Sequence, residues 1–349
     1  MKRYVDISLL SGILMSTVIS FSTMASAEKP NITVLATGGT IAGSSMSKTD
    51  TTDYKAGSIG IDKLIRAVPE ISDVANVYGE QISNVISDDV DSDILLKLSH
   101  RVNQLFNEGQ QGVVITHGTD TLEESAFFLD LTVKSGHPVV FAGAMRPATA
   151  LSADGPMNLL EAVTLAADKK AAGRGALIVL NDRIGSAFYT TKTNSTTTDT
   201  FKAIEPGYLG VFISGKPRFY YPPMRATDQV YFDVSKIKKL PDVEILYAYS
   251  GQTPDVLEAT VKSSVKGIVI AGNGNGSLST RMESAVRALN EKGFPVIIAT
   301  RTGSGYVSSK SYGISSGFLN AQKSRILLQL ALATGADMKK IAEYFDHQR

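Results

Sequence analysis

The chain has 349 residues, with 35 lysines and arginines against 34 aspartates and glutamates, so its formal net charge at pH 7 is +1. A near-neutral chain lacks the basic field that attracts nucleic acid or an anionic membrane, which excludes both as partners. It has no cysteine, and none of its four histidines falls in an HExxH pattern, so we expect no disulfide, no thiolate zinc site and no metal.

Residues 1–27 have the pattern of a secretory signal peptide. A short basic region precedes a mostly apolar run at residues 7–21, and Ala25-Ser26-Ala27 fits the cleavage site of such peptides. The run is short and interrupted by serines, which argues against a membrane anchor. Cleavage would remove two positive charges and one negative charge, which takes the net charge from +1 to 0. We predict a periplasmic protein whose mature chain begins at Glu28.

Strand-like and helix-like patterns alternate along the mature chain. Apolar runs without a period of two, typical of strands covered on both faces, occur at residues 32–36, 113–116, 139–142 and 176–180. Helical spacing of apolar residues occurs at Leu122, Ala126, Leu129 and Val133. We expect this helix to begin with a capping box formed by Thr121 and Glu124, and a second helix to run from Pro156 toward Ala172.

A change of composition after Tyr208 indicates two domains. Prolines, aromatic residues and basic residues interrupt the periodicity, and we take residues 216–240 as the linker. Strands are expected beyond it at residues 243–247, 267–271 and 295–300, with helices near 254–265, 280–292, 321–334 and 338–345. The sequence predicts an α/β fold: a larger N-terminal domain, residues 28–215, with a mostly parallel sheet flanked by helices, and a smaller C-terminal α/β domain, residues 241–349.

Two predicted strands of the larger domain end in turns rich in threonine and glycine. Residues 31–43 (NITVLATGGTIAG) contain Gly39 and Thr40, and residues 112–125 (GVVITHGTDTLEES) contain Gly118 and Thr119. Ligands of parallel α/β sheets collect beyond the carboxyl ends of the strands. Glycines there let backbone N–H groups approach a ligand, and the hydroxyls can line the cavity. One such turn would be an ordinary loop closure, but two at equivalent strand ends predict a binding site.

Two other glycine-rich patterns resemble nucleotide-binding loops without the residues that those loops need. Residues 38–43 have the glycine spacing of a P-loop, but the next residue is Ser44, where a P-loop has its phosphate-binding lysine. Residues 272–277 (GNGNGS) follow a strand, but a serine stands in place of the third glycine of a dinucleotide turn. We therefore expect no nucleotide and no other cofactor.

A threonine hydroxyl becomes a nucleophile only when a base takes its proton. Thr40 is not the mature N-terminus, so it cannot use its own amine. A lysine can serve if it is uncharged when it accepts the proton, with a carboxylate nearby to stabilise the ammonium that forms. Lys192 is a candidate base and Asp120 a candidate partner, although the polar stretch at residues 190–200 is, taken alone, more typical of a solvated loop.

Five motifs in sequence order resemble one known family. They are TGGTIAG at residues 37–43, HGTDT at 117–121, GAMRP at 143–147, SADGPMN at 152–158 and TKTN at 191–194. Together they resemble the exported, type II bacterial L-asparaginases and glutaminase-asparaginases, over essentially the whole mature chain. The resemblance implies hydrolysis of the side-chain amide of L-asparagine to aspartate and ammonia, with L-glutamine as a second substrate.

The resemblance also implies roles for single residues. Thr40 matches the primary nucleophile, which would form a covalent acyl-enzyme. Tyr54 matches the tyrosine that activates this threonine and closes over the substrate. Thr119, Lys192 and Asp120 match a second group, which activates the water or the nucleophile. N–H groups at the glycine turns would stabilise the oxyanion.

Substrate contacts and assembly follow from the same resemblance. Ser87 matches the residue that holds the substrate α-carboxylate, and Asp120 reaches the α-amino group. Asp88, where the family commonly has glutamine or glutamate, can hold this amino group differently, which leaves the preference between asparagine and glutamine open. Asn275 matches a position that reaches into the site of a neighbouring subunit. The family forms tetramers built as dimers of dimers.

Two further departures and one alternative remain. Residues 302–313 contain no acidic residue, although family members often supply a glutamate there to the neighbouring site, and Phe188 stands where an arginine is common. A periplasmic amino-acid-binding protein would share the signal peptide, the two α/β domains and the small ligand, but that likeness is one of architecture alone. Release of ammonia from asparagine separates the two functions.

Overall fold

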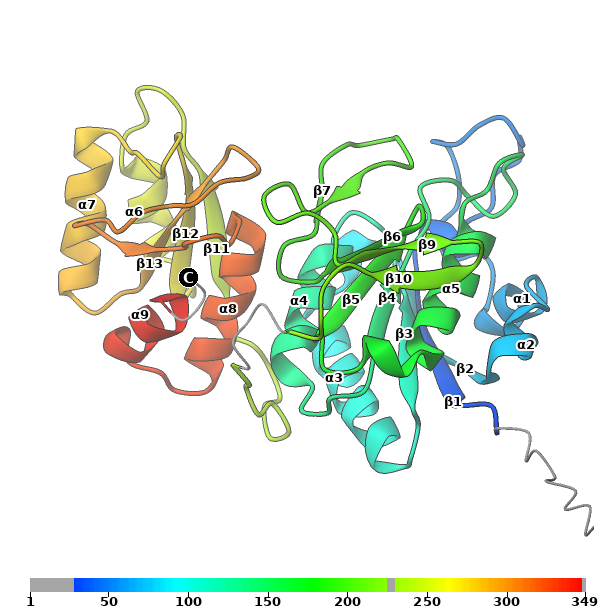
Figure 1. Cartoon of the computed structure of the whole chain (residues 1–349). Coiled ribbons are helices and arrows are strands. Elements are labelled where there is room, and N and C mark those ends of the chain that lie inside the picture. The colour runs from blue at the N-terminus through cyan, green and yellow to red at the C-terminus, as the bar shows by residue number, and fades with distance from the viewer. Residues whose placement is uncertain (1–27, 225–229, 347–349) are drawn as a thin grey trace, which may run out of the picture.

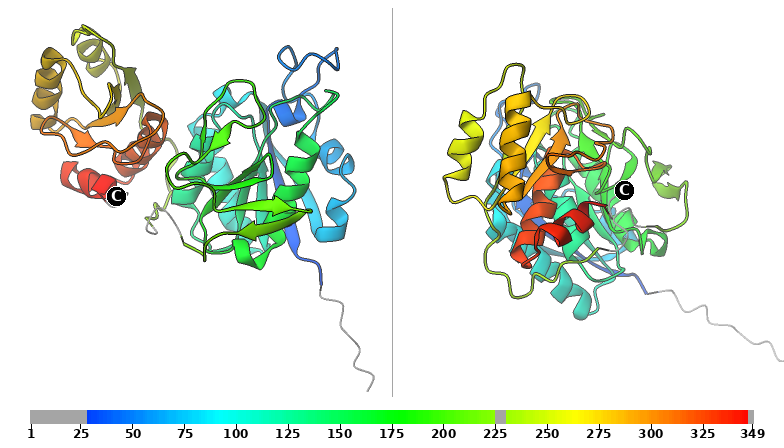
Figure 2. Two further views of the ribbon diagram at one scale, coloured as in Figure 1. Left: turned by 45° about the horizontal axis from the view of Figure 1, so that its top comes forward. Right: turned by 90° about the vertical axis from the view of Figure 1, so that its left-hand side faces the viewer.

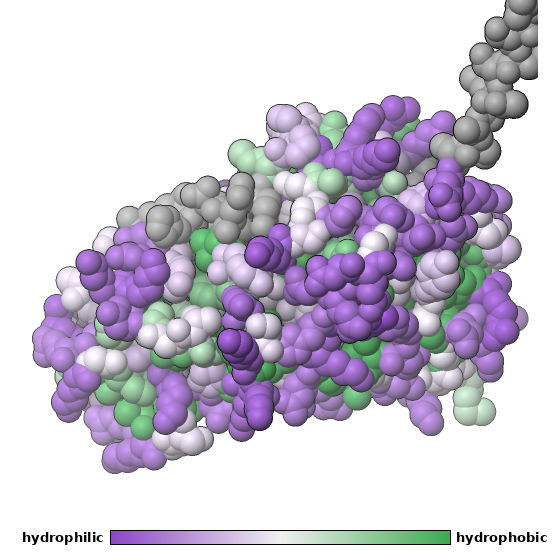
Figure 3. Space-filling model, turned by 90° about the horizontal axis from the view of Figure 1, so that it is seen from below, coloured by the Kyte–Doolittle hydropathy of each residue, from purple (hydrophilic) through white to green (hydrophobic). Residues whose placement is uncertain are grey.

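The computed structural model describes residues 28–224 and 230–346, which form two α/β domains (Figure 1). The expected signal peptide, residues 1–27, lies outside the described residues. Within the two described ranges, no helix combines the length and the apolarity needed to cross a membrane. Hydrophilic residues dominate the face of the molecule in Figure 3, and apolar residues appear on it in small groups.

The larger domain contains an eight-stranded sheet in the order β10-β9-β6-β5-β4-β3-β1-β2. Its parallel part comprises β1 (Asn31–Gly38), β2 (Asn76–Val85), β3 (Gly112–Thr116), β4 (Val139–Ala142) and β5 (Ala176–Leu180). The antiparallel extension comprises β6 (Arg183–Ser186), β9 (Gly210–Ile213) and β10 (Lys216–Phe219). The four predicted strands are confirmed as β1, β3, β4 and β5, and the sheet is mostly parallel, as predicted.

Helices cover both faces of this sheet. One face carries α3 (Ser92–Asn107) and α4 (Leu122–Thr132), and the other carries α1 (Ile61–Arg66), α2 (Ile71–Val74) and α5 (Gly155–Ala167). In β3, Val113 and Ile115 are buried in the core beside α3 and α4, whereas Val114 is buried in the core beside α5. This double burial explains why the central strands show no alternation of apolar and polar residues.

Two boundaries differ from the sequence prediction. The helix expected to run to Ala172 ends at Ala167, because Asp168 leaves the helical conformation and accepts the N–H of Lys170 to start a 3-10 turn, η3 (Lys169–Ala171). The expected linker begins inside the sheet, because residues 216–219 form β10 and pair with β9. A tight turn with positive φ at Ser214 and Gly215 closes this hairpin, and Pro217 is tolerated because β10 is an edge strand.

The smaller domain contains a parallel four-stranded sheet. Its strands are β11 (Val243–Tyr247), β12 (Gly267–Gly272), β13 (Val296–Thr300) and β14 (Ile314–Ser315), and its helices are α6 (Asp255–Val261), α7 (Thr280–Glu291), α8 (Ala321–Ala333) and α9 (Met338–Asp346). The three predicted strands and four predicted helices are confirmed. Strand β14 has only two residues and gives no pattern in the sequence.

The two domains share an apolar core. One cluster of buried side chains includes Phe127 of α4, Leu327 of α8 and Val269 of β12. Figure 1 shows α8 on the side of the smaller domain that faces the larger one, and the left view of Figure 2 shows the same arrangement. Helix α8 therefore belongs structurally to both domains, which matters for the site described below.

A buried carboxyl of α5 predicts a pH dependence of stability. The side chain of Glu161 is 3% exposed. Burial, together with a hydrogen bond to Asp182 and its charge, raises the pKa of Glu161 from 4.5 to about 8. Because the folded state holds this proton more tightly than the unfolded chain, the stabilisation is complete below pH 4.5 and is lost as the pH rises through 8.

Replacing Glu161 by glutamine should remove this loss, since the amide can still donate to Asp182 and does not titrate. We expect Glu161→Gln to match the wild type near pH 5 and to have a Tm higher by a few degrees near pH 9. Thermal unfolding at several pH values measures the difference, with Glu291→Gln at an exposed position of α7 as control. If the Tm of the wild type and the Tm of Glu161→Gln changed with pH in the same way, Glu161 would not hold the proton that we assign to it.

Candidate active site

The two threonine-glycine turns meet at one edge of the large sheet. Strands β1 and β3 are parallel neighbours, with Ala36 opposite Thr116, so both turns leave at the same edge. Gly39 has φ of 77°, and a Cβ on it would lie only 2.3 Å from the Cα and N atoms of Gly118. Only two glycines permit this backbone approach. The glycines therefore bring the segments that carry the two threonines together.

Thr40 pairs with Tyr54. The Thr40 side chain, in the 3-10 turn η1 (Thr40–Ala42), is 5% exposed, and its Oγ1 lies 2.6 Å from the Tyr54 hydroxyl. Backbone hydrogen bonds between Ser44 and Lys55 fold residues 44–55 back toward the turn. The Tyr54 ring packs so closely that a Cβ on Gly43 would lie 2.9 Å from it. The hairpin thus places the Tyr54 hydroxyl beside the nearly buried hydroxyl of Thr40.

Thr119 pairs with Lys192 and Asp120. The Nζ of Lys192 donates to Thr119 Oγ1 at 3.0 Å and to Asp120 Oδ1 at 2.5 Å. Thr119 is 5% exposed, whereas the Asp120 side chain is 61% exposed. Lys192 lies in the short strand β7 (Thr191–Lys192), which pairs with β8 (Phe201–Lys202). The lysine of the polar stretch is therefore held by two side chains of the second threonine turn.

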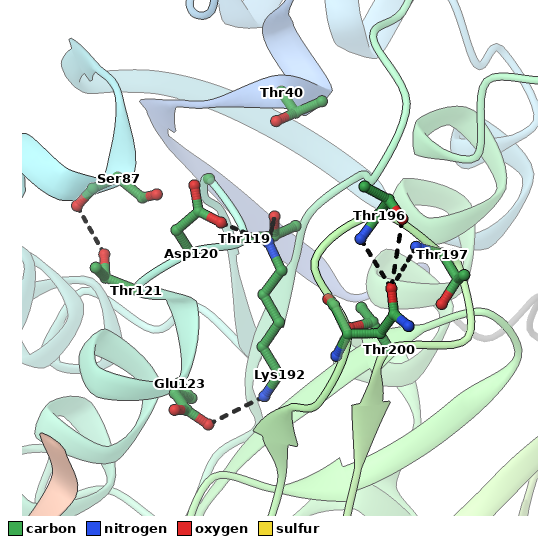
Figure 4. A network of polar contacts seen from close by, with 12 residues as sticks. Thr40, Ser87, Thr119, Asp120, Thr121, Glu123, Lys192, Thr196, Thr197 and Thr200 are labelled. Atoms are coloured by element: carbon green, nitrogen blue, oxygen red, sulfur yellow. Dashed lines mark hydrogen bonds and ion pairs between the residues drawn. The ribbon is translucent and has the colours of Figure 1, made fainter. Parts of the chain in front are cut away.

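Figure 4 shows how the groups lie relative to one another. Thr40 stands across from Thr119 and Asp120, and Ser87 lies beyond Asp120. The contact between Gly39 and Gly118 confines the two threonines to one region of the protein. The arrangement brings two hydroxyls, a lysine amine and a carboxylate together at one edge of the large sheet.

Ser87 is held against the second turn. It begins the 3-10 turn η2 (Ser87–Asp89), its side chain is buried, and a Cβ on Gly118 would lie 2.9 Å from its Oγ. The Ser87 carbonyl accepts a hydrogen bond from Thr121 Oγ1 at 2.6 Å (Figure 4). Asp88 follows with an exposed side chain. A buried hydroxyl and an exposed carboxylate therefore stand next to each other at the edge of the site.

The bond from Thr121 corrects one sequence prediction. Thr121 precedes α4 at the N-cap position, but its side chain does not cap the helix. The expected capping box with Glu124 is wrong, because the Thr121 hydroxyl is committed to the Ser87 carbonyl. A contact between segments distant in sequence has replaced the local one. Thr121 is thus a residue that positions Ser87, and local sequence spacing gave no sign of it.

Buried His117 fixes the peptide beside Thr119. Its Nδ1 lies 2.7 Å from the Gly118 carbonyl oxygen and its Nε2 lies 2.8 Å from Ser125 Oγ. Burial lowers the pKa of His117 to about 4, so the ring is neutral near pH 7. A neutral ring fits these partners when Nδ1–H donates to the carbonyl and Nε2 accepts from the serine. This histidine therefore orients the Gly118 peptide.

Glu123 is a second residue that the sequence did not reveal. Its side chain is buried, and its Oε2 accepts the backbone N–H of Lys192 at 3.2 Å (Figure 4). Its Oε1 accepts hydrogen bonds from Gln322 at 2.6 Å and from Asn320 at 3.4 Å, both in the smaller domain. Glu123 thus joins the backbone of Lys192 to the start of α8. Glu123 is one of two acidic residues in the first turn of α4, and the sequence pattern does not distinguish it from Glu124.

Two residues from the sequence analysis lie elsewhere. Asn275 follows β12 in the smaller domain, where it exchanges hydrogen bonds with Ser308 at 2.8 and 2.9 Å. No hydrogen bond of the described residues joins it to the threonine turns. Phe188 is buried, with its ring 4.5 Å from that of Tyr189 and 5.9 Å from that of Phe127. It is a core residue rather than a polar group of the site. Across residues 28–224 and 230–346, no cluster of acidic or histidine side chains is suited to hold a metal ion.

Comparisons with known proteins place this geometry in context. The family described as "Asparaginase, N-terminal" matches residues 31–225, and "Glutaminase/Asparaginase C-terminal domain" matches residues 242–345. The chain is 50% identical to "L-asparaginase 2" of Bacillus subtilis over 335 residues, which covers 94% of this chain and 89% of that protein. It is 45% identical to "Probable L-asparaginase periplasmic" of Haemophilus influenzae, which covers 92% of this chain and 93% of that protein. The crystal structure of "Probable Cytoplasmic L-asparaginase" from Campylobacter jejuni has a TM-score of 0.88 at 46% identity, and covers 91% of this chain and 100% of that one.

Proposed function

The chain belongs to the asparaginase family, and we propose that it hydrolyses the side-chain amide of L-asparagine to L-aspartate and ammonia through an acyl-enzyme on Thr40. One observation supports the assignment of roles. Each of the two threonines has its own proton partner, Tyr54 for Thr40 and Lys192 for Thr119, and both stand at a contact that only glycines allow.

The first half of the reaction uses Thr40 and Tyr54. Thr40 Oγ1 attacks the amide carbon, and its proton moves along the 2.6 Å hydrogen bond to the Tyr54 oxygen. Tyr54 passes its own proton to the amide nitrogen, the C–N bond breaks, and ammonia leaves. The tetrahedral oxyanion is stabilised by backbone N–H groups of the two glycine turns. The product is an aspartyl ester on Thr40, and the tyrosine is unchanged.

The second half uses Thr119, Lys192 and Asp120. Water attacks the ester carbon, the bond to Thr40 Oγ1 breaks, and the proton of the water restores the Thr40 hydroxyl. Thr119 orients this water, and Lys192 takes up and returns protons while Asp120 stabilises its ammonium form. Lys192 can take up a proton only as the uncharged amine, because the ammonium form that donates to Thr119 has no lone pair to accept one.

Recognition of a small zwitterion explains the remaining groups. The buried Ser87 hydroxyl binds the substrate α-carboxylate, and the exposed carboxylates of Asp120 and Asp88 bind the α-ammonium. Gly39 and Gly118 supply the backbone N–H cradle. Charge-assisted hydrogen bonds of this kind are about twice as strong as neutral ones, which favours a free amino acid over an amide within a protein chain.

Release of ammonia from L-asparagine and L-glutamine, measured side by side, tests the proposal. We expect turnover of asparagine and a slower side activity on glutamine, because one methylene separates the two substrates and discriminates by only about 10–200-fold. A competing periplasmic binding protein would bind asparagine without releasing ammonia. Binding by calorimetry with no ammonia would therefore reject the hydrolase and favour that alternative.

We also propose that residues 1–27 direct export to the periplasm and that the mature chain forms a homotetramer as a dimer of dimers. Export is supported by the basic, apolar and small-residue pattern of the N-terminus and by the Haemophilus influenzae relative whose name is periplasmic. The relative of known structure from Campylobacter jejuni is named cytoplasmic, so location varies among similar proteins. In such an assembly Asn275 would reach the site of a neighbouring subunit.

A further inference from the structure

The start of α8 contacts the chain that leads to Lys192. Lys323, in the first turn of this helix, is 2% exposed. Its Nζ donates to the carbonyl oxygens of Phe188 at 2.8 Å and of Thr190 at 2.7 Å. These carbonyls lie four and two residues before Lys192. A side chain of the smaller domain thus holds the backbone that enters β7.

A buried ammonium is costly unless its donors are satisfied. Burial lowers the pKa of Lys323 to about 8, and the carboxylates of Glu123, Asp130 and Glu124 oppose this shift. Lys323 therefore carries its charge near pH 7 although solvent does not reach it. Two hydrogen bonds to carbonyls of the turn that leads into β7 are a specific use for such a group, since an apolar side chain would fill the same space without the desolvation cost.

A second connection fixes the backbone of Lys192 itself. Glu123 accepts the backbone N–H of Lys192, and Gln322, which precedes Lys323 in α8, donates to the other oxygen of Glu123. Carbonyls before Lys192 and the N–H of Lys192 itself are therefore all held by contacts that involve α8. The strand has little freedom to shift along or across the sheet.

We propose that Lys323 is a positioning residue, through which the smaller domain of the same chain sets the place of Lys192 Nζ relative to Thr119 Oγ1. The inference rests on the proposed function, because it assumes that Lys192 takes part in proton transfer. The bonds of Lys192 to Thr119 and Asp120 are 3.0 and 2.5 Å long, and they exist only while the backbone of β7 stays in place. A displacement of about 1 Å of a catalytic group lowers rates by about 100-fold.

Lys323→Met keeps the length of the side chain and removes its donors. We expect kcat for asparagine to fall at least tenfold, with KM within about threefold of the wild type, because the substrate contacts of Ser87 and Asp88 remain. Gln329→Leu is the matched control. Gln329 is buried in the same helix and donates to the Pro241 carbonyl at 3.0 Å, far in sequence from β7. It should lower the Tm and leave kcat unchanged.

A double-mutant cycle separates positioning from general stability. If Lys323 acts through Lys192, Lys323→Met should lower kcat by less than about twofold in the Lys192→Met background. Full additivity, or an equal loss of kcat in Gln329→Leu, would overturn the inference. Full activity of Lys192→Met would instead refute the role that the proposed function gives to Lys192. Should Lys323→Met fail to fold, Gln322→Ala at a half-buried position is expected to lower kcat in the same non-additive way, and wild-type kcat there would overturn the inference as well.

Discussion

Replacing Thr40 by alanine is expected to lower kcat/KM for L-asparagine by at least about 10⁴-fold, since no other described hydroxyl is paired with Tyr54. The fold should survive, because the hydroxyl has a single side-chain partner and alanine is compatible with the turn that contains Thr40. We expect the Tm to change by only a few degrees. Ammonia release and thermal unfolding, measured on the same preparation, check both parts.

A matched control and a trapping experiment sharpen this prediction. Thr49→Ala changes an exposed hydroxyl of the same hairpin, whose partner is Ser47, and should retain wild-type activity. Mass spectrometry of enzyme quenched during turnover should find the aspartyl ester on the peptide that contains Thr40. Near-normal ammonia release by Thr40→Ala, or the ester on a peptide with Thr119 instead, would transfer the nucleophilic role to the second threonine.

The sequence predicted the elements whose residues are buried on both sides. Val113, Val114 and Ile115 face two different cores, which produces an apolar run that is easy to recognise. Strand β2 was missed because it lies at the edge of the sheet and most of its side chains are partly or fully exposed. Strand β10 was taken for linker because Pro217, permitted only at a sheet edge, is also a typical loop residue.

In the site, too, features set by neighbouring residues were predictable, and contacts between residues far apart in the sequence were not. The glycines beside Thr40 and Thr119 were recognisable because two such turns at strand ends are unusual. The role of Thr121 was not recognisable, because its hydroxyl donates to the Ser87 carbonyl instead of capping the helix that follows it. The contact between Glu123 and Gln322 spans 199 residues, so no local pattern contains it. What the sequence left out are the contacts that orient the site rather than the groups to which we assign the reaction.

Replacing Lys192 by methionine is expected to lower kcat by about 10²–10⁴-fold, the usual contribution of a general acid-base group. KM should change by only a few-fold, because Lys192 has no hydrogen bond to Ser87 or Asp88, and the Asp120 carboxylate that it contacts is still present in the variant. Asp120 loses an ion-pair partner, but its side chain is 61% exposed and stays hydrated. Steady-state kinetics with asparagine at saturating and limiting concentrations separate the two parameters.

The half of the reaction that is slowed in Lys192→Met identifies the role of Lys192. If it serves the attack of water, Lys192→Met should still release one equivalent of ammonia in a rapid burst and should accumulate the ester on Thr40. A slow burst would place the lysine in the first half of the reaction, together with Thr40 and Tyr54. Lys202→Met, on the paired strand β8 in an exposed ion pair with Asp199, is the matched control and should turn over normally. An equal loss in Lys202→Met would show that any change in this hairpin disturbs the site, and a normal kcat in Lys192→Met would remove the lysine from the mechanism.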